Sequence, residues 1–227
     1  MLEALKEEVL AANLMLPELG LARFTWGNAS GADRASGFIV IKPSGVEYAA
    51  MREGDLAVVD MESGRLVEGK KPSSDTAAHI ALYKAFPFIG GVAHTHSRFA
   101  TVFAQRESGI PPLGTTHADH FRGEVPCARA MTPEELAGDY ERNIGLVVAA
   151  ACKSPREVPG ALAARHGPFA WGGSPREAVF NAAVLEEVAL LAWHSLAFRE
   201  TLPPLPPELA DRHYYRKHGE SAYYGQG

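Results

Sequence analysis

Cysteine is scarce in this 227-residue chain: Cys127 and Cys152 lie far apart and form no C-x-x-C motif. The small disulfide-stapled folds of secreted domains are therefore excluded. We expect two reduced, inert thiols, as in a protein of a reducing compartment.

Positive charge is also in short supply, since the formal net charge is -5 and lysine and arginine are spread along the chain. This distribution predicts no basic surface that would bind nucleic acid or an anionic membrane, although local groups could hold a small anionic substrate. The start, MLEALKEEVL, lacks the basic residues and apolar core of a signal peptide. No stretch of roughly 20 uninterrupted apolar residues predicts a membrane helix. We expect a soluble, cytoplasmic protein.

What the chain does contain is enough apolar sequence, 46%, for the core of a single domain over residues 1–227. Helical spacing of apolar residues predicts helices over 2–19, 73–86, 97–107 and 175–198, with another from Pro133. Strand patterns around turn residues predict hairpins over 24–45, 56–69 and 161–172, and a strand over 89–96. Residues 116–128 are expected to be loop-like with a short strand. The interleaving predicts an α/β fold with a mixed or mainly antiparallel sheet covered by helices.

Two histidines stand one residue apart in GGVAHTHSRFATVFAQ, at the end of an apolar run. Side chains two apart on a strand point to the same face, so His94 and His96 are placed to chelate one metal ion. A catalytic zinc is typically bound by such imidazoles, with a position left open. Two partly buried histidines satisfied by backbone carbonyls explain a bare H-x-H about equally well.

A metal needs more ligands, and the residue types alone do not choose among the remaining histidines. His166 is attractive because it stands at a strand end before Gly167-Pro168. His194 lies inside an apolar helix and is expected to be packed in the core. His117 and His120 surround Asp119 in a predicted loop, which suits either a catalytic loop or a polar turn.

Three short segments offer donors for an anion: Gly27-Asn28, Lys42-Pro43-Ser44-Gly45 and Pro72-Ser73-Ser74-Asp75. Each combines amide, hydroxyl or ammonium groups with backbone that can expose N-H groups, and the last leads into a helix N-terminus, where phosphate is favoured. Taken singly, each is more often an ordinary turn or a helix cap.

Taken together and in order, these pieces resemble a known family. WGN, IKPSG, PSSD, HTH, GTTHAD, RHGPFAWG and the ending HYYRKHG-x-x-AYYGQ resemble the L-ribulose-5-phosphate 4-epimerases of the class II aldolase/adducin superfamily. The likeness spans Met1 to Gln226 without large insertions, with the greatest departure over residues 132–159.

The resemblance implies a role for each matching position. The metal ligands would be His94, His96 and His166, with Asp75 at or beside the metal. The substrate phosphate would be bound by Gly27, Asn28, Lys42, Ser44, Gly45, Ser73 and Ser74. The catalytic residues would be the acid/base pair Asp119 and Tyr224, together with His213 nearby. Zinc is the implied metal, and manganese or cobalt could use the same ligands.

The resemblance further implies a cyclic homotetramer with sites between subunits, in which the aromatic tail over 211–227 completes a neighbour's site. The implied activity interconverts L-ribulose 5-phosphate and D-xylulose 5-phosphate by cleaving and re-forming the C3-C4 bond. These motifs are alike in epimerases of L-arabinose catabolism and of L-ascorbate use.

Two alternatives remain open. An aldolase of the L-fuculose-1-phosphate type would share the metal and the bond cleavage. The resemblance implies that such an aldolase carries a glutamate, acting as base, at the position where this chain has Asp75. A non-catalytic adducin-like interaction domain should lack the metal histidines.

Overall fold

Seven strands form one sheet in the order β4-β3-β2-β1-β5-β7-β6, in a computed structural model that describes residues 2–199, 201–220 and 222–224. The strands are β1 (Asn28–Asp33), β2 (Phe38–Ile41), β3 (Ala57–Asp60), β4 (Leu66–Glu68), β5 (Gly91–His94), β6 (Gly160–Ala163) and β7 (Gly167–Gly172). Every neighbouring pair is antiparallel. The predicted α/β fold with a mainly antiparallel sheet is confirmed.

Helices precede, separate and follow these strands. They are α1 (Glu3–Glu18), α2 (Thr76–Ala85), α3 (Arg98–Gln105), α4 (Thr115–Ala118), α5 (Pro133–Ala137), α6 (Tyr140–Ala151), α7 (Pro175–Phe198) and α8 (Pro207–His218), with short 3₁₀ turns at Tyr48–Ala50 and Glu53–Asp55. The predicted helices and hairpins are confirmed. The short helix α4 stands where a loop was expected, and α6 was not anticipated.

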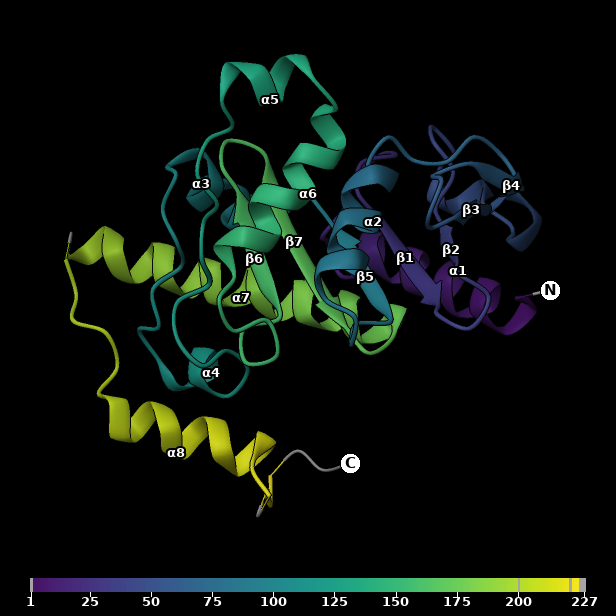
Figure 1. Ribbon diagram of the computed structural model, residues 1–227. Coiled ribbons are helices and arrows are strands. Elements are labelled where there is room, and N and C mark those ends of the chain that lie inside the picture. The colour runs from purple at the N-terminus through teal and green to yellow at the C-terminus, as the bar shows by residue number, and fades with distance from the viewer. Residues whose placement is uncertain (1, 200, 221, 225–227) are drawn as a thin grey trace.

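Alternation along the strands gives the sheet two apolar faces. Ile39, Ile41 and Val92 point into a core formed with α2 and α6, whereas Val40 and Ala93 point into a core formed with α1 and α7. Figure 1 shows α2 and α6 on the opposite side of the sheet from α1 and α7. The sheet is therefore covered by helices on both faces.

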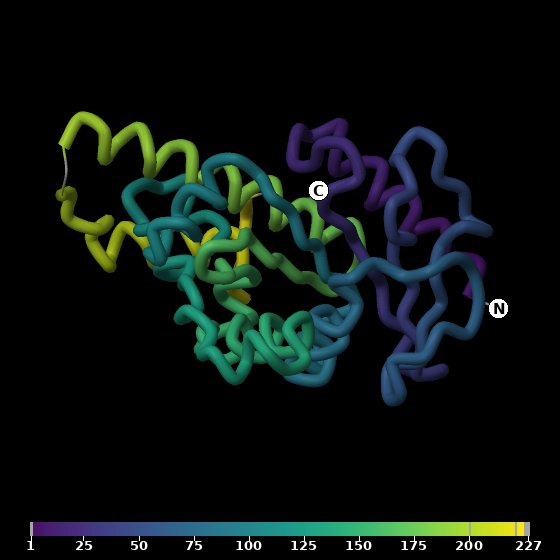
Figure 2. The backbone as a smooth tube through the Cα atoms, turned by 90° about the horizontal axis from the view of Figure 1, so that it is seen from above, coloured from purple at the N-terminus to yellow at the C-terminus, as the bar shows by residue number. Residues whose placement is uncertain are grey.

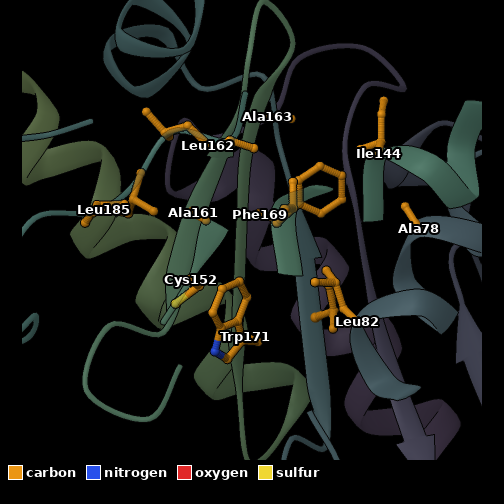
Figure 3. Close-up of a cluster of buried hydrophobic side chains, with 14 of the residues drawn as sticks. Ala78, Leu82, Ile144, Cys152, Ala161, Leu162, Ala163, Phe169, Trp171 and Leu185 are labelled. Carbon is orange, nitrogen blue, oxygen red and sulfur yellow. The ribbon is translucent and has the colours of Figure 1, made fainter. Parts of the chain in front are cut away.

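The larger core extends along the sheet from β2 and β3 to β5, β6 and β7. Phe169 and Trp171 of β7 are buried with Leu82 of α2 and Ile144 of α6 (Figure 3). The indole N-H of Trp171 donates to the Pro155 carbonyl oxygen at 2.8 Å, so its one polar atom is satisfied. This packing fixes β7 and the turn before it.

Within the described ranges, α7 is long and apolar enough to cross a bilayer by length and composition, a test that core helices also pass. Here α7 packs along β7 and β5 and against α1. Its first turn is capped by Ser174, whose hydroxyl accepts the Glu177 N-H, with proline at the first helical position. Both features confirm the predicted helix start.

The chain turns back after α7 at the end of the molecule remote from β2, β3 and β4 (Figures 1 and 2). Helix α8 then packs against α4. The loop that carries Asp119 and the C-terminal segment therefore lie side by side.

Candidate active site

His94 is the last residue of β5 and is wholly buried. Its imidazole stacks on the Phe169 ring, with centroids 4.2 Å apart, and its Nδ1 lies 2.9 Å from the Pro168 carbonyl oxygen. Because a carbonyl oxygen can only accept, Nδ1 carries the proton and Nε2 keeps a lone pair. Burial lowers the pKa of His94 to about 3, so the ring is neutral at physiological pH.

Three imidazole nitrogens converge at this point. His94 Nε2 lies 3.0 Å from His166 Nε2 and 3.3 Å from His96 Nε2. One ligand atom from each of the three histidines falls within 4.8 Å of the others. Burial lowers the pKa of His96 and of His166, which keeps their lone pairs available. The donor set fits a catalytic zinc site with three protein ligands and an open position.

The prediction that His96 lies on the same strand as His94 is wrong. Strand β5 ends at His94, and His96 lies in the turn that leads to α3, so strand alternation does not place it. Its convergence with His94 comes from the direction of that turn. His166 lies in the turn between β6 and β7, as its position before Gly167-Pro168 indicated.

Asp75 lies beside this group and is engaged by another side chain. Its Oδ2 accepts a hydrogen bond from Asn28 Nδ2 at 2.6 Å. Burial opposes its ionisation, but the neighbouring His94 and His79, with the Asn28 hydrogen bond, hold the pKa of Asp75 below its ordinary value. The three-histidine group does not include Asp75, and direct ligation by Asp75 stays a prediction.

A cavity of about 620 Å³ opens over these residues. It is lined by Thr25, Trp26, Gly27, Asn28, Lys42, Pro43, Ser44, Gly45, Ser73, Ser74, Asp75, His96 and His166. All the residues predicted to bind substrate phosphate thus line the same cavity as two of the three converging histidines. Their assignment to phosphate stays a prediction.

Strand pairing brings the Gly27-Asn28 segment to the histidines, because Asn28 is the register partner of His94. Gly27 has φ +75°, and a Cβ there would lie 2.9 Å from the His94 carbonyl oxygen. Only glycine allows both this conformation and this close approach. This conformation and this contact explain why the WGN motif has glycine at its second position.

Lys42 brings a buried ammonium to the cavity wall, with 2% of the residue exposed. Its Nζ lies 3.3 Å from the Pro43 carbonyl oxygen and 4.9 Å from the centre of the Tyr48 ring. Burial lowers the pKa of Lys42, and the Asp75 charge opposes that shift. An anion bound in the cavity would stabilise this cation further.

The remaining predicted catalytic residues form a second cluster. Asp119 accepts hydrogen bonds from His213 Nδ1 at 3.0 Å and from Arg216 through both carboxylate oxygens, at 3.0 and 2.8 Å. Burial alone would raise the pKa of Asp119, but Arg216 and His213 together lower it. The Arg216 guanidinium also lies 4.4 Å from the Tyr224 ring centre. The structure thus brings Asp119, His213 and Tyr224 together, and none of the three lines the 620 Å³ cavity.

Two tyrosines outside the set of predicted site residues contact the site. The Tyr48 hydroxyl reaches the carbonyl oxygens of Trp26 and Gly27 at 2.8 and 2.9 Å. The Tyr140 hydroxyl lies 3.4 Å from His166 Nδ1. Tyr48 lies three residues after the IKPSG motif, so its place near the site could have been predicted from the sequence. No local sequence pattern connects Tyr140 with His166, which lies 26 positions away.

Other residues singled out from the sequence lie elsewhere. Cys127 and Cys152 are free thiols, as predicted. His194 is exposed, so its prediction as a core residue is wrong: the helix pattern identified α7 but not the face of α7 that is covered. His117 is buried, and its Nε2 lies 2.6 Å from the Gly123 carbonyl oxygen, which makes it an anchor of the turn after α4.

The chain is similar to known proteins over most of its length. The profile of the Class II Aldolase and Adducin N-terminal domain matches residues 7–193. The protein called L-ribulose-5-phosphate 4-epimerase UlaF of Salmonella paratyphi B is 50% identical over 228 residues, which cover 99% of this chain and 100% of that relative. The protein of the same name from Salmonella typhi matches equally well.

Solved structures agree on the fold. A structure called L-fuculose 1-phosphate aldolase is 25% identical with a TM-score of 0.81, covering 95% of this chain and 97% of that one. The L-fuculose-1-phosphate aldolase of Thermus thermophilus is 28% identical with a TM-score of 0.68, covering 88% and 98%. YgbL of Klebsiella pneumoniae, described as a putative aldolase/epimerase/decarboxylase, is 27% identical with a TM-score of 0.75, covering 92% and 97%.

Proposed function

Because this chain belongs to the class II aldolase and adducin family, we propose that it interconverts L-ribulose 5-phosphate and D-xylulose 5-phosphate as a metal-dependent C4 epimerase. The observation that carries the proposal is one cavity in which imidazole nitrogens for a metal meet amide, hydroxyl and ammonium donors for a phosphate. The full-length likeness to proteins named as 4-epimerases supports the choice of reaction.

The chemistry explains why an epimerase would use an aldolase-like site. The C4 hydrogen of the ketose is beta to the C2 carbonyl and is not acidic, so simple removal and return of that proton is not available. When a base takes the C4 hydroxyl proton instead, the C3-C4 bond can break. The products are glycolaldehyde phosphate and the enediolate of dihydroxyacetone, which receives the electron pair. Rotation of the aldehyde before the bond re-forms inverts C4.

His94, His96 and His166 would hold the divalent ion, for which zinc is the proposed identity. Such an ion supplies Lewis-acid stabilisation of negative charge on the substrate oxygens. The protein contributes three neutral imidazoles, one of them fixed in its tautomer by the Pro168 carbonyl oxygen. Asp75 adds a negative charge beside the ligands and orients Asn28 by accepting a hydrogen bond from its Nδ2. Asn28 Oδ1 is buried and has no partner among the residues that the structure describes.

The other end of the cavity would hold the phosphate. Lys42 supplies the charge, and the hydroxyls of Ser44, Ser73 and Ser74 supply donors. Phosphate binding also keeps glycolaldehyde phosphate in the cavity while its carbonyl turns. Retention of that fragment is what distinguishes an epimerase from an aldolase.

The acid/base groups would come from a neighbouring subunit. Asp119, His213 and Tyr224 are preorganised together yet do not line the cavity of their own chain, which supports a homotetramer with sites between subunits. Paired with Arg216, Asp119 is ionised at neutral pH and can accept a proton. The tail over 211–227, of which residues 221 and 225–227 lie outside the described part of the chain, would then complete the partner's site. A cytoplasmic location follows from the charge of the substrate, which does not cross membranes unaided.

The test is to incubate zinc-loaded protein with L-ribulose 5-phosphate and follow the carbon signals by NMR. D-xylulose 5-phosphate without free fragments is expected. Accumulation of glycolaldehyde phosphate and dihydroxyacetone would instead favour an aldolase, the second candidate, which the L-fuculose 1-phosphate aldolase structures motivate. Metal-loaded protein that leaves the substrate unchanged would refute the proposed reaction.

A further inference from the structure

A glutamate in the middle of α7 holds the beginning of α3, the helix that follows the metal-binding turn. Glu186 Oε1 accepts the Phe99 N-H at 2.9 Å, and its Oε2 accepts the Ala100 N-H at 2.9 Å. These are among the amides that an α-helix leaves without an internal partner at its start. One carboxylate from a distant helix thus satisfies two of them at once.

This contact replaces the ordinary cap. Ser97 stands at the N-cap position of α3, where a serine hydroxyl usually accepts from the second or third amide. Here the side chain makes no capping bond, and Ser97 Oγ is buried without a partner in the part of the chain that the structure describes. Glu186 therefore takes over the role of Ser97, and its negative charge lies at the positive end of the α3 dipole.

The position of this clamp bears on the metal site. His96 immediately precedes Ser97, and β5 ends at His94, so strand hydrogen bonds do not hold His96. Helix α7, which carries Glu186, packs on β5 and β7, and these strands adjoin His94 and His166. A tie from α7 to the start of α3 therefore fixes the backbone beside His96 relative to the elements that carry the other two histidines.

We propose that Glu186 is a positioning residue for the metal centre, which holds the His96 turn in the geometry that completes the three-imidazole site. The inference rests on the proposed function, since it concerns the same metal. Partners outside the ligand set that orient metal ligands commonly change metal affinity by about 10- to 100-fold when they are removed.

The experiment compares Glu186→Gln with Glu187→Gln in the full chain. Glu187 is the adjacent, exposed residue of the same helix, so its substitution makes the same chemical change outside the clamp. Zinc affinity is measured by competition with a chromophoric chelator, the visible spectrum is recorded with Co²⁺, and thermal unfolding is followed for the metal-free proteins. We expect Glu186→Gln to raise the zinc Kd at least about tenfold and to alter the Co²⁺ spectrum. The zinc Kd of Glu187→Gln should stay within about twofold of the native value.

A purely structural cap would lower the melting temperature of metal-free Glu186→Gln while its zinc Kd and Co²⁺ spectrum stayed native, and that result overturns the inference alone. Failure of the native chain to bind zinc would overturn the proposed function as well. If Glu186→Gln cannot be purified, Glu186→Asp keeps the charge but is too short to reach both amides. Native zinc affinity in Glu186→Asp would then overturn the inference.

Discussion

Removing the Tyr48 hydroxyl tests how the part of the cavity that we propose binds phosphate is held in place. The hydroxyl reaches two successive carbonyl oxygens, those of Trp26 and Gly27, and burial raises the pKa of Tyr48, so the group stays a protonated donor at neutral pH. Tyr48→Phe leaves these partly buried carbonyls without that donor, at a cost of roughly 1–2 kcal/mol. For a domain of this size the melting temperature should fall by roughly 2–8 °C.

The same substitution should weaken substrate binding more than catalysis. Gly27 and Asn28 line the cavity, and the turn that they form would lose its anchor, whereas the imidazoles would not be touched. We expect KM for L-ribulose 5-phosphate to rise roughly three- to tenfold, equivalent to about 0.7–1.4 kcal/mol, with kcat within about twofold of native.

A matched control separates loop anchoring from loss of stability. Tyr83 is also buried, and its hydroxyl lies 2.9 Å from Ser30 Oγ, away from the cavity lining. Tyr83→Phe should lower the melting temperature while KM stays native. Steady-state kinetics and thermal unfolding of both variants provide the assay. A native KM in Tyr48→Phe, or an equal rise in both variants, would refute the anchoring argument.

Three further predictions concern the histidines and the tail. His96→Asn should lose both stoichiometric zinc and activity, as measured by metal analysis, because it removes one of three converging nitrogens. Tyr224→Phe should keep the zinc but slow turnover at least about tenfold in steady-state assays, because it removes a proposed acid/base group. The metal-free protein should lose stability below about pH 6.5, because burial lowers the pKa of both His79 and His117 to about 4 and only the unfolded chain takes up their protons there. Each of the two should cost about 1.4 kcal/mol per pH unit between pH 6.5 and 4, measurable by urea unfolding.

Each of these has a contrary outcome. His194→Asn replaces an exposed histidine outside the metal group, and it should retain zinc; loss of zinc in both histidine variants would remove the specific role of His96. Native turnover in Tyr224→Phe would exclude it as acid or base. Unfolding free energies that do not change between pH about 6.5 and 4.5 would contradict the buried, neutral state of His79 and His117.

Local sequence was enough to predict most of the individual elements. The leucine spacing of α1, the Ser174-Pro175 start of α7 and the alternation in β2 and β3 each depend on residues within a few positions of one another. The motifs around Gly27, Lys42 and Ser73 likewise identified the residues that line the cavity. Local periodicity and turn chemistry are sufficient to predict these features because the residues whose interactions produce them are close together in the sequence.

Contacts between distant segments became visible only in the folded chain. His166 meets His94 across 72 positions, and Glu186 meets Phe99 across 87. The end of β5 at His94, and the exposed position of His194 on α7, also depend on which neighbouring elements are present to pair with or cover them. Such contacts follow from the sheet order and helix packing of the whole chain, and no local pattern encodes them.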